Sequence, residues 1–182
     1  MQYQKSITLR DGTVCLLRGA DADDAEQVLN NFNLTHAQTE FLLTYPEESS
    51  MTVEDEREFL AKSAASSNSI EICAIIDGEI VGTAGFSAVG SQVKLRHRAE
   101  FGISIDRTYW GRGIGRALTE ACIACARTAG YAQLELDVVA ENTAALALYK
   151  RTGFVEYGCN PRGFRTRDGR WQELILMRME LS

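Results

Sequence analysis

The sequence predicts an α/β fold in which helices flank one mixed, largely antiparallel sheet, within a single domain over residues 1–182. Three observations predict it. Two helical patterns occur near the start, three strands joined by tight turns follow in the middle, and strands alternate with helices at the end. A chain of this length typically forms one domain and can bury a core without disulfides or a structural metal.

The first half is expected to hold two helices and a meander of strands. Thr52 and Asp55 have the spacing of a capping box, and Asp77-Gly78 between two apolar runs is a strong hairpin signal. Pro46 disfavours a helix at the residue before it. The expected elements are a strand at Thr13–Arg18, a helix from Asp21 or Asp23 to about Phe32, an irregular stretch at 33–50, a helix from Thr52 to about Ser66, and strands at Ile70–Ile76, Glu79–Phe86 and Val93–Ile105.

In the second half, the hydrophobic period changes from that of a strand to that of a helix after a glycine-rich segment. Apolar residues recur at helical spacing from Gly113 onward, and Gly130 and Gly153 are suited to end helices. Asp168-Gly169 is a second hairpin turn. The expected elements are helices at Gly113–Ala129 and Asn142–Thr152, strands at Leu134–Val139, Phe154–Tyr157 and Trp171–Glu180, and a loop through Arg162, Gly163 and Phe164.

Charge is distributed unevenly along the chain. The net charge is -6, but residues 1–91 carry 5 Lys and Arg against 15 Asp and Glu (net -10), whereas residues 92–182 carry 14 against 10 (net +4). A pI of about 5.0 argues against a nucleic-acid partner and against docking on anionic membranes. The uneven distribution favours a site where an anionic ligand meets a cationic one.

We expect a cytoplasmic protein with reduced thiols. The chain starts without the apolar stretch of a signal peptide, no run approaches the roughly 18 apolar residues of a membrane span, and the five cysteines are scattered. Cys122 and Cys125 form a Cys-x-x-Cys, but no second pair accompanies them, and His36 and His97 are the two histidines of the chain. The pair is therefore expected to pack inside a helix, and no metal site is expected.

The most informative segment is the glycine-rich one between a predicted strand and a predicted helix. Its three alternate glycines allow a tight turn with exposed amides, and the first amides of a helix lack internal partners and lie at the positive end of its dipole. Two arginines add full charge. The segment is thus a preformed site for a phosphate or pyrophosphate, built from Trp110, Gly111, Arg112, Gly113, Ile114, Gly115 and Arg116.

Two common phosphate-binding motifs do not match this segment. A P-loop requires Lys followed by Ser or Thr after the glycines, and none follows here. A dinucleotide fingerprint requires a third glycine where Arg116 stands. Glu135 does lie at the distance of a ribose ligand, but the loop follows a meander rather than the strand–helix unit of that fold.

This loop and a second segment together resemble the GNAT superfamily of N-acetyltransferases. The coenzyme A loop of that superfamily reads Gln/Arg-x-x-Gly-x-Gly/Ala, and Trp110, Gly113 and Gly115 fall in that frame, with Trp110 replacing the polar first residue. The second superfamily segment reads Asn-x-x-Ala-x-x-x-Tyr-x-x-x-Gly-Phe and matches the stretch from Asn142 to Phe154. The order of elements also agrees, so the resemblance implies the GNAT-like acyl-CoA N-acyltransferase fold.

For the donor, the resemblance implies that the strand at 101–105 splays from the strand at 134–139 and that the pantetheine arm of acetyl-CoA lies in the gap. The arm would pair with backbone groups of Ile103 and Ile105. A backbone N–H of this strand, which includes Ser104, would hold the oxyanion.

Two residues are catalytic candidates. By resemblance, Tyr149 protonates the leaving thiolate, and reference pKa values of about 10 for a phenol and about 8.5 for a thiol make that transfer feasible; otherwise Tyr149 is a half-buried aromatic. Glu100 could take the proton of the acceptor amine, or it could be an edge charge paired with Arg98 or Arg96. Asn142 caps a helix by position and, by resemblance, contacts the cofactor.

Acceptor-binding groups are expected from the segments 33–48 and 162–167. For each residue taken individually, a solvated loop charge or local packing is the favoured interpretation. The candidate pocket walls are Phe41, Tyr45 and Phe164, and the acids that could attract an amine are Glu40, Glu47 and Glu48.

The sequence therefore favours an acetyl-CoA-dependent N-acetyltransferase that moves the acetyl group directly to a primary amine in a ternary complex, since no cysteine is clearly placed as an acyl carrier. The acceptor could be a small molecule or a peptide amine, such as one of a ribosomal protein. The alternative is a non-catalytic acyl-CoA-binding or regulatory module on the same fold. A homodimer is compatible with either function.

Overall fold

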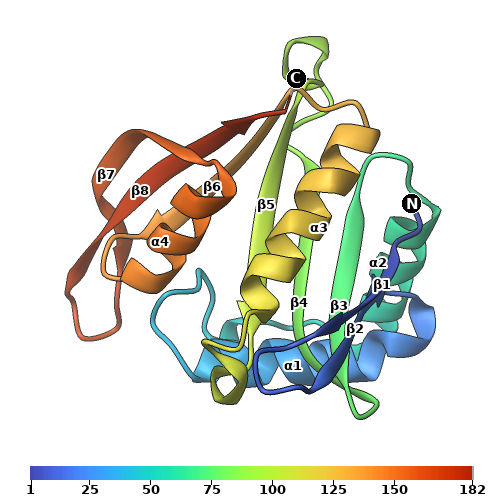
Figure 1. Cartoon of the computed structure of the whole chain (residues 1–182). Helices are drawn as coiled ribbons and strands as arrows, with labels where there is room; N and C mark the ends of the chain where they lie inside the picture. Colours follow the sequence, from blue (N-terminus) through green and yellow to red (C-terminus); the bar gives the residue numbers. More distant parts are fainter. Residues whose placement is uncertain (182) are drawn as a thin grey trace.

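The computed structural model describes residues 1–181 and contains one eight-stranded sheet in the order β1-β2-β3-β4-β5-β6-β8-β7 (Figure 1). Its strands are β1 (Gln4–Thr8), β2 (Val14–Gly19), β3 (Ile70–Ile76), β4 (Glu79–Ala88), β5 (Arg98–Ile105), β6 (Gln133–Val139), β7 (Val155–Arg165) and β8 (Trp171–Glu180). The helices are α1 (Ala25–Ala37), α2 (Val53–Ala65), α3 (Ile114–Thr128) and α4 (Thr143–Thr152). Neighbouring strands are antiparallel except β5 and β6, which confirms the expected mixed, largely antiparallel sheet.

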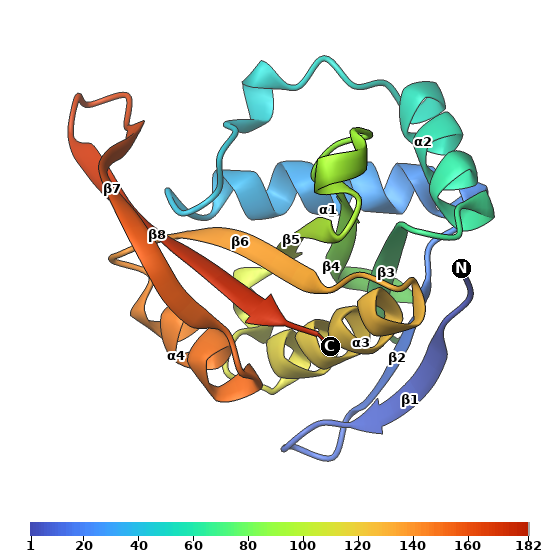
Figure 2. The same ribbon diagram turned by 90° about the horizontal axis from the view of Figure 1, so that it is seen from above.

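Helices cover both faces of the sheet, with α1 and α2 on one face and α3 and α4 on the other (Figure 2). The main core includes Ile72 of β3, Leu118 of α3 and Phe154, all of them almost fully buried. A smaller cluster on the other face includes Val28 of α1 and Leu60 of α2. Because full burial of one such side chain contributes about 1.5–3 kcal/mol, these two layers hold the sheet rigid beneath any site built on it.

Strands β5 and β6 stay paired over a short distance and then diverge into a V (Figure 1). Their register begins at Arg98–Gln133 and ends at Glu100–Glu135. The Arg98 guanidinium donates two hydrogen bonds to the Glu135 carboxylate, one of them 2.6 Å long from Nη2 to Oε2, and so holds the strands together at the closed end. The expected splay of the strand at 101–105 is therefore confirmed.

Local signals placed several element boundaries correctly. Thr52 caps α2, with its hydroxyl accepting from the Asp55 N–H at 3.2 Å and the Asp55 carboxylate accepting from the Thr52 N–H at 2.9 Å. Asp77 and Gly78 form the turn between β3 and β4 with φ of 53° and 87°, as expected of a hairpin turn of this sequence. Gly153 ends α4 with φ of 104°, a conformation that glycine adopts without strain.

Other elements differ from the expectations. The strand β1 was not predicted, because Ile7 is the only apolar residue in it. Helix α1 continues to Ala37, into the stretch expected to be irregular. The strand expected from Val93 begins at Arg98, after a 3-10 turn that leaves Val93 exposed. The loop expected at 162–164 belongs to β7, whose residues are almost all exposed, so that its composition is that of a loop.

The cysteines are free thiols, and four of the five are buried. Cys122 and Cys125 lie in the main core as part of α3, which confirms the expectation of packing. No helix within residues 1–181 is long and apolar enough to cross a bilayer.

Candidate active site

The glycine loop connects the open end of β5 to the start of α3. Gly111 and Gly113 have φ of 76° and 104°, and Gly113 is the N-cap of α3 without a side-chain cap. A Cβ atom built on either glycine would meet nothing within 4 Å. The first amides of α3, including those of Ile114 and Gly115, lack partners within the helix as at any helix start, and the two glycines leave open space beside the loop. This is the geometry of an anion-binding helix N-terminus, and it fits a pyrophosphate.

Trp110 attaches this loop to β5. Its indole Nε1–H donates to the Ile105 carbonyl oxygen at 2.7 Å, and the Arg107 guanidinium lies 5.8 Å from its ring centroid. The ring is still 44% exposed. The residue that departs from the superfamily pattern thus fixes the position of the loop.

Both arginines of the loop form ion pairs in this structure, which the sequence did not indicate. The Arg112 guanidinium forms an ion pair with Asp11 and donates to the Thr13 hydroxyl at 3.0 Å. Arg116 is paired with Glu120 one turn further along α3, at 2.7 Å. In this structure the loop therefore offers an anion mainly its backbone amides.

Helix α3 packs closely against its surroundings at Gly115. A Cβ at this position would lie 3.3 Å from Leu148 Cδ2 and 3.4 Å from Ile105 Cδ1. The small residue thus lets the start of α3 approach both α4 and the end of β5. Leu148 precedes Tyr149, so the same contact positions the candidate acid beside the V.

The backbone of β5 presents free groups to the V. The Asp106 N–H donates to the Val81 carbonyl of the β4 side at 2.9 Å, and in an antiparallel ladder every second residue points its backbone groups to the same neighbour. Those of Ile103 and Ile105 consequently point away from β4, toward the gap left by β6. The Ile105 carbonyl is already used by Trp110, which leaves the groups of Ile103 and the Ile105 N–H for a ligand.

Tyr149 lies on the α3–α4 side of the sheet and is 7% exposed. Its ring packs edge-on against Phe101, with centroids 6.1 Å apart, and against Phe154 at 5.8 Å. Burial raises the pKa of the phenol well above its ordinary value, so the hydroxyl stays protonated at neutral pH. Asn142 caps α4, accepting from the Ala145 N–H at 3.2 Å, as expected from its position.

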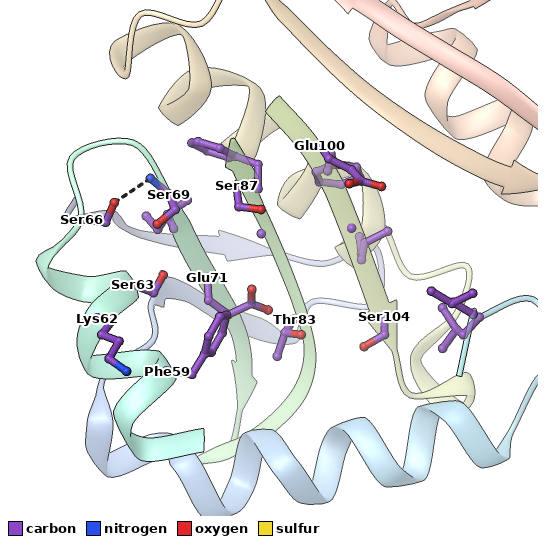
Figure 3. Close-up of a pocket in the computed structure, with 18 of the residues that line it drawn as sticks. Phe59, Lys62, Ser63, Ser66, Ser69, Glu71, Thr83, Ser87, Glu100 and Ser104 are labelled. Carbon is purple, nitrogen blue, oxygen red and sulfur yellow. Dashed lines mark hydrogen bonds between the residues drawn. The ribbon is translucent and has the colours of Figure 1, made fainter. Parts of the chain in front are cut away.

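A cavity of about 630 Å³ lies on the opposite face, between the sheet and the helices α1 and α2 (Figure 3). Glu100, Gly102 and Ser104 of β5 line it because alternate residues of a strand share a face. Arg98 is engaged by Glu135, and Glu100 forms no ion pair within residues 1–181. The alternative in which Glu100 is an edge charge paired with Arg98 is therefore wrong.

The expected acceptor walls are only partly brought together. Phe41 lines a second cavity of about 420 Å³ that also includes Trp110 and Arg107. Tyr45 and Phe164 line neither of these two cavities.

The acids expected to attract an amine are engaged in local contacts. The carboxylate of Glu40 accepts from the Tyr45 hydroxyl at 2.7 Å, Glu48 accepts from the Tyr45 N–H at 2.8 Å, and Glu47 is paired with Arg167. The pair with Arg167, together with the Arg167 N–H that donates to the Tyr45 hydroxyl at 3.2 Å, joins the segment 38–48 to the turn of the β7–β8 hairpin. All three acids thus have local partners, and their role toward an amine stays a prediction.

The residue that sequence reasoning missed is Glu71, which lines the 630 Å³ cavity from β3 (Figure 3). It is the only charged residue in a strand that otherwise reads Ile, Ile, Cys, Ala, Ile and Ile. A lone carboxylate between buried strand residues was a usable signal, since charged groups are rarely buried without a partner.

Comparisons with known proteins agree with this geometry. A model of the acetyltransferase (GNAT) family matches residues 34–154. The ribosomal protein bS18-alanine N-acetyltransferase of Escherichia coli is 39% identical over 92 residues, which are 50% of this chain and 62% of that relative. A GNAT-family acetyltransferase from Streptococcus pneumoniae superposes with a TM-score of 0.88 at 31% identity, covering 91% of this chain and 99% of that one.

A third similarity is one of fold. A phosphinothricin acetyltransferase of the GNAT superfamily from Sinorhizobium meliloti, solved in complex with AcCoA, superposes with a TM-score of 0.81 at 20% identity, covering 97% of this chain and 90% of that one. The family match extends over more than half of the sequence, and it includes the V, the glycine loop and α4. The chain belongs to the acetyltransferase (GNAT) family.

Proposed function

We propose that this protein is an acetyl-CoA-dependent N-acetyltransferase that transfers the acetyl group directly to a primary amine in a ternary complex. The observation that carries the proposal is the V between β5 and β6. It has an anion-binding helix N-terminus at its open end and an acid-lined cavity on one face. A donor in the V and an acceptor in the cavity would meet at the edge of β5.

The donor would be held mainly by backbone groups. The amides at the start of α3 would bind the pyrophosphate, and the free backbone groups of Ile103 would pair with the pantetheine arm. The N–H groups along this edge would also stabilise the oxyanion. Asn142, at the start of α4, would contact the arm from the other side of the V.

Glu100 and Tyr149 would divide the proton transfers between the two faces of β5. Acetyl-CoA supplies the thioester. Glu100 takes a proton from the acceptor ammonium, and the freed amine nitrogen attacks the thioester carbonyl carbon. As the carbon–sulfur bond breaks, the Tyr149 hydroxyl gives its proton to the sulfur, and the new amide nitrogen loses its second proton to solvent. The phenol is in its acid form at neutral pH, but burial raises its pKa and so makes it a weaker acid than a free phenol.

A turnover screen of acetyl-CoA against amines tests the proposal. The panel contains small amines and an alanine-ended peptide, because one relative acts on a ribosomal protein. We expect release of free thiol with at least one amine, and Tyr149→Phe should lower kcat by about 100-fold or more. Coenzyme A affinity of the variant should be unchanged. Tight coenzyme A binding without turnover of any amine would favour the binding-module alternative.

We also propose a reducing, cytoplasmic location. Four buried free thiols and one exposed free thiol are typical of proteins that stay reduced. Fractionation of the native host with a thiol-trapping reagent tests it, and a disulfide involving Cys159 would contradict it.

A further inference from the structure

Glu71 occupies an unusual position in the floor of the 630 Å³ cavity. It is the register partner of Gly85 on β4, and a Cβ built on Gly85 would lie 2.2 Å from Glu71 Oε2. The carboxylate therefore lies over β4 in the space that a side chain at position 85 would take. Figure 3 shows it on the cavity side of the sheet, near Thr83.

The next register position across the sheet also lacks a side chain. Gly85 is in turn the register partner of Gly102 on β5, and a Cβ on Gly102 would meet nothing within 4 Å. A trough thus runs from Glu71 to the edge of β5, beside Glu100. Since neighbouring strands are about 4.8 Å apart, the carboxylate that leans over β4 lies roughly 5–10 Å from the place where the acetyl group would be transferred.

Among residues 1–181, this carboxylate has no cationic partner at ion-pair distance. Glu71 forms no ion pair with any cation of residues 1–181. Lys62 lines the cavity from α2 on the side away from Glu100 (Figure 3), and its Nζ lies 3.6 Å from Glu58. The nearby Arg18 is held by Asp24 through bonds of 2.6 and 2.7 Å.

The remaining titratable neighbours increase the negative character of the cavity or are neutral. Glu56 of α2 is 6% exposed, and its charge acts unfavourably on that of Glu71. His36 of α1 lines the cavity, and burial lowers its pKa, so it is uncharged at neutral pH. Glu100 adds a second carboxylate at the β5 end of the trough.

We propose that Glu71 binds a second cationic group of the acceptor, so that the substrate is a diamine rather than a monoamine or an amino acid. This inference rests on the proposed function. One amino group would lie at Glu100 for acetyl transfer, and the other would enter the trough and form a charge-assisted hydrogen bond with Glu71. An acceptor that carries a carboxylate would place it against two uncompensated acids, which costs binding energy.

The protonation of Glu71 supports this assignment. Burial raises the pKa of its carboxyl from 4.5 to about 7, opposed by hydrogen bonding to Thr83 and reinforced by Glu56. A bound ammonium would favour the ionised form and lower that pKa again. In the free protein only hydrogen bonding to Thr83 favours the charged state of this acid, and a cationic ligand would add to that.

The test compares three matched acceptors, 1,4-diaminobutane, 1-aminobutane and 4-aminobutanoate, in the wild type, Glu71→Gln and Glu79→Gln. Glu79 is exposed at the start of β4 and serves as the control for loss of one charge. We expect the wild type to prefer the diamine and Glu71→Gln to lower kcat/KM for it by about 30-fold or more, chiefly through KM. Turnover of 1-aminobutane should stay unchanged, which also shows that the variant is folded.

Calorimetric binding of 1,4-diaminobutane separates this inference from the proposed function. Diamine binding that Glu71→Gln abolishes, without acetylation of any amine, would refute the enzyme and support the cation site. Acetylation of the diamine and 1-aminobutane with equal kcat/KM, unchanged in Glu71→Gln, would support the enzyme and refute the cation site.

Discussion

The half-buried carboxyl of Glu71 makes the stability of this protein depend on pH in a way that one substitution isolates. In the folded chain its pKa is raised from 4.5 to about 7, so between these values the native state keeps a proton that the unfolded state releases. The stabilising contribution of the protonated form is complete below about 4.5 and is lost as the pH rises through about 7.

The size of the effect follows from that difference in pKa. At 1.36 kcal/mol for each unit, a rise from 4.5 to about 7 means that ionisation of Glu71 at high pH costs the folded state at most about 3.4 kcal/mol. Glutamine has the same shape and does not titrate. Glu71→Gln should therefore match the wild type at pH 4.5 and exceed its free energy of unfolding at pH 8.5 by about 2–3 kcal/mol.

Urea denaturation of the wild type, Glu71→Gln and Glu79→Gln at both pH values measures this. The informative quantity is how much the difference in free energy of unfolding between variant and wild type changes from pH 4.5 to pH 8.5. Titrating groups that both proteins share cancel in that difference. Glu79→Gln should show no such change. If the difference for Glu71→Gln were the same at both pH values, Glu71 would titrate alike in the folded and unfolded states, and the argument that it is an uncompensated buried acid would be refuted.

Two further predictions concern glycines. Gly85→Ala should lower the free energy of unfolding by about 1–3 kcal/mol because its methyl group would lie 2.2 Å from Glu71 Oε2 and 2.6 Å from the Ile70 carbonyl oxygen. Gly102→Ala, which meets nothing within 4 Å, should not lower it, and equal urea midpoints of the two variants would contradict this. Gly113→Val should weaken coenzyme A binding severely. The control Gly130→Val has a similar positive φ at the other end of α3 and should lose stability but keep its affinity for coenzyme A. Calorimetry with coenzyme A distinguishes the two variants, and normal affinity in Gly113→Val would refute the loop assignment.

The features predicted correctly are those that short stretches of chain determine. The cap of α2 depends on Thr52 and Asp55, three residues apart, and the β3–β4 turn depends on Asp77 and Gly78. The same holds for the glycine loop, because the conformation of Gly113 and the free amides after it need no distant partner. Local chemistry was enough to locate the anion site.

The features that were not predicted depend on contacts between distant segments. Arg112 meets Asp11, 101 residues away, in the turn after a strand that the hydrophobic pattern did not indicate. Glu71 becomes significant only when β3, β4 and β5 align it with Gly85 and Gly102. No periodicity in one segment reveals which glycine will face which carboxylate across a sheet.

The same contacts change the meaning of the uneven charge distribution. The two arginines of the loop are paired with Asp11 and Glu120. Hydrogen bonds from Thr13, with the help of Arg112, lower the pKa of Asp11 to about 2. The ion pair between Asp11 and Arg112 therefore persists across the physiological pH range. The amides of α3, whose dipole does not titrate, then provide the attraction for an anion at every such pH. On the acidic side the reverse holds, because Glu71 forms no ion pair within residues 1–181 and its charge varies with pH near neutrality. Donor affinity should thus be nearly independent of pH, whereas binding of a cationic acceptor should strengthen as the pH rises through about 7, as long as the acceptor itself remains protonated.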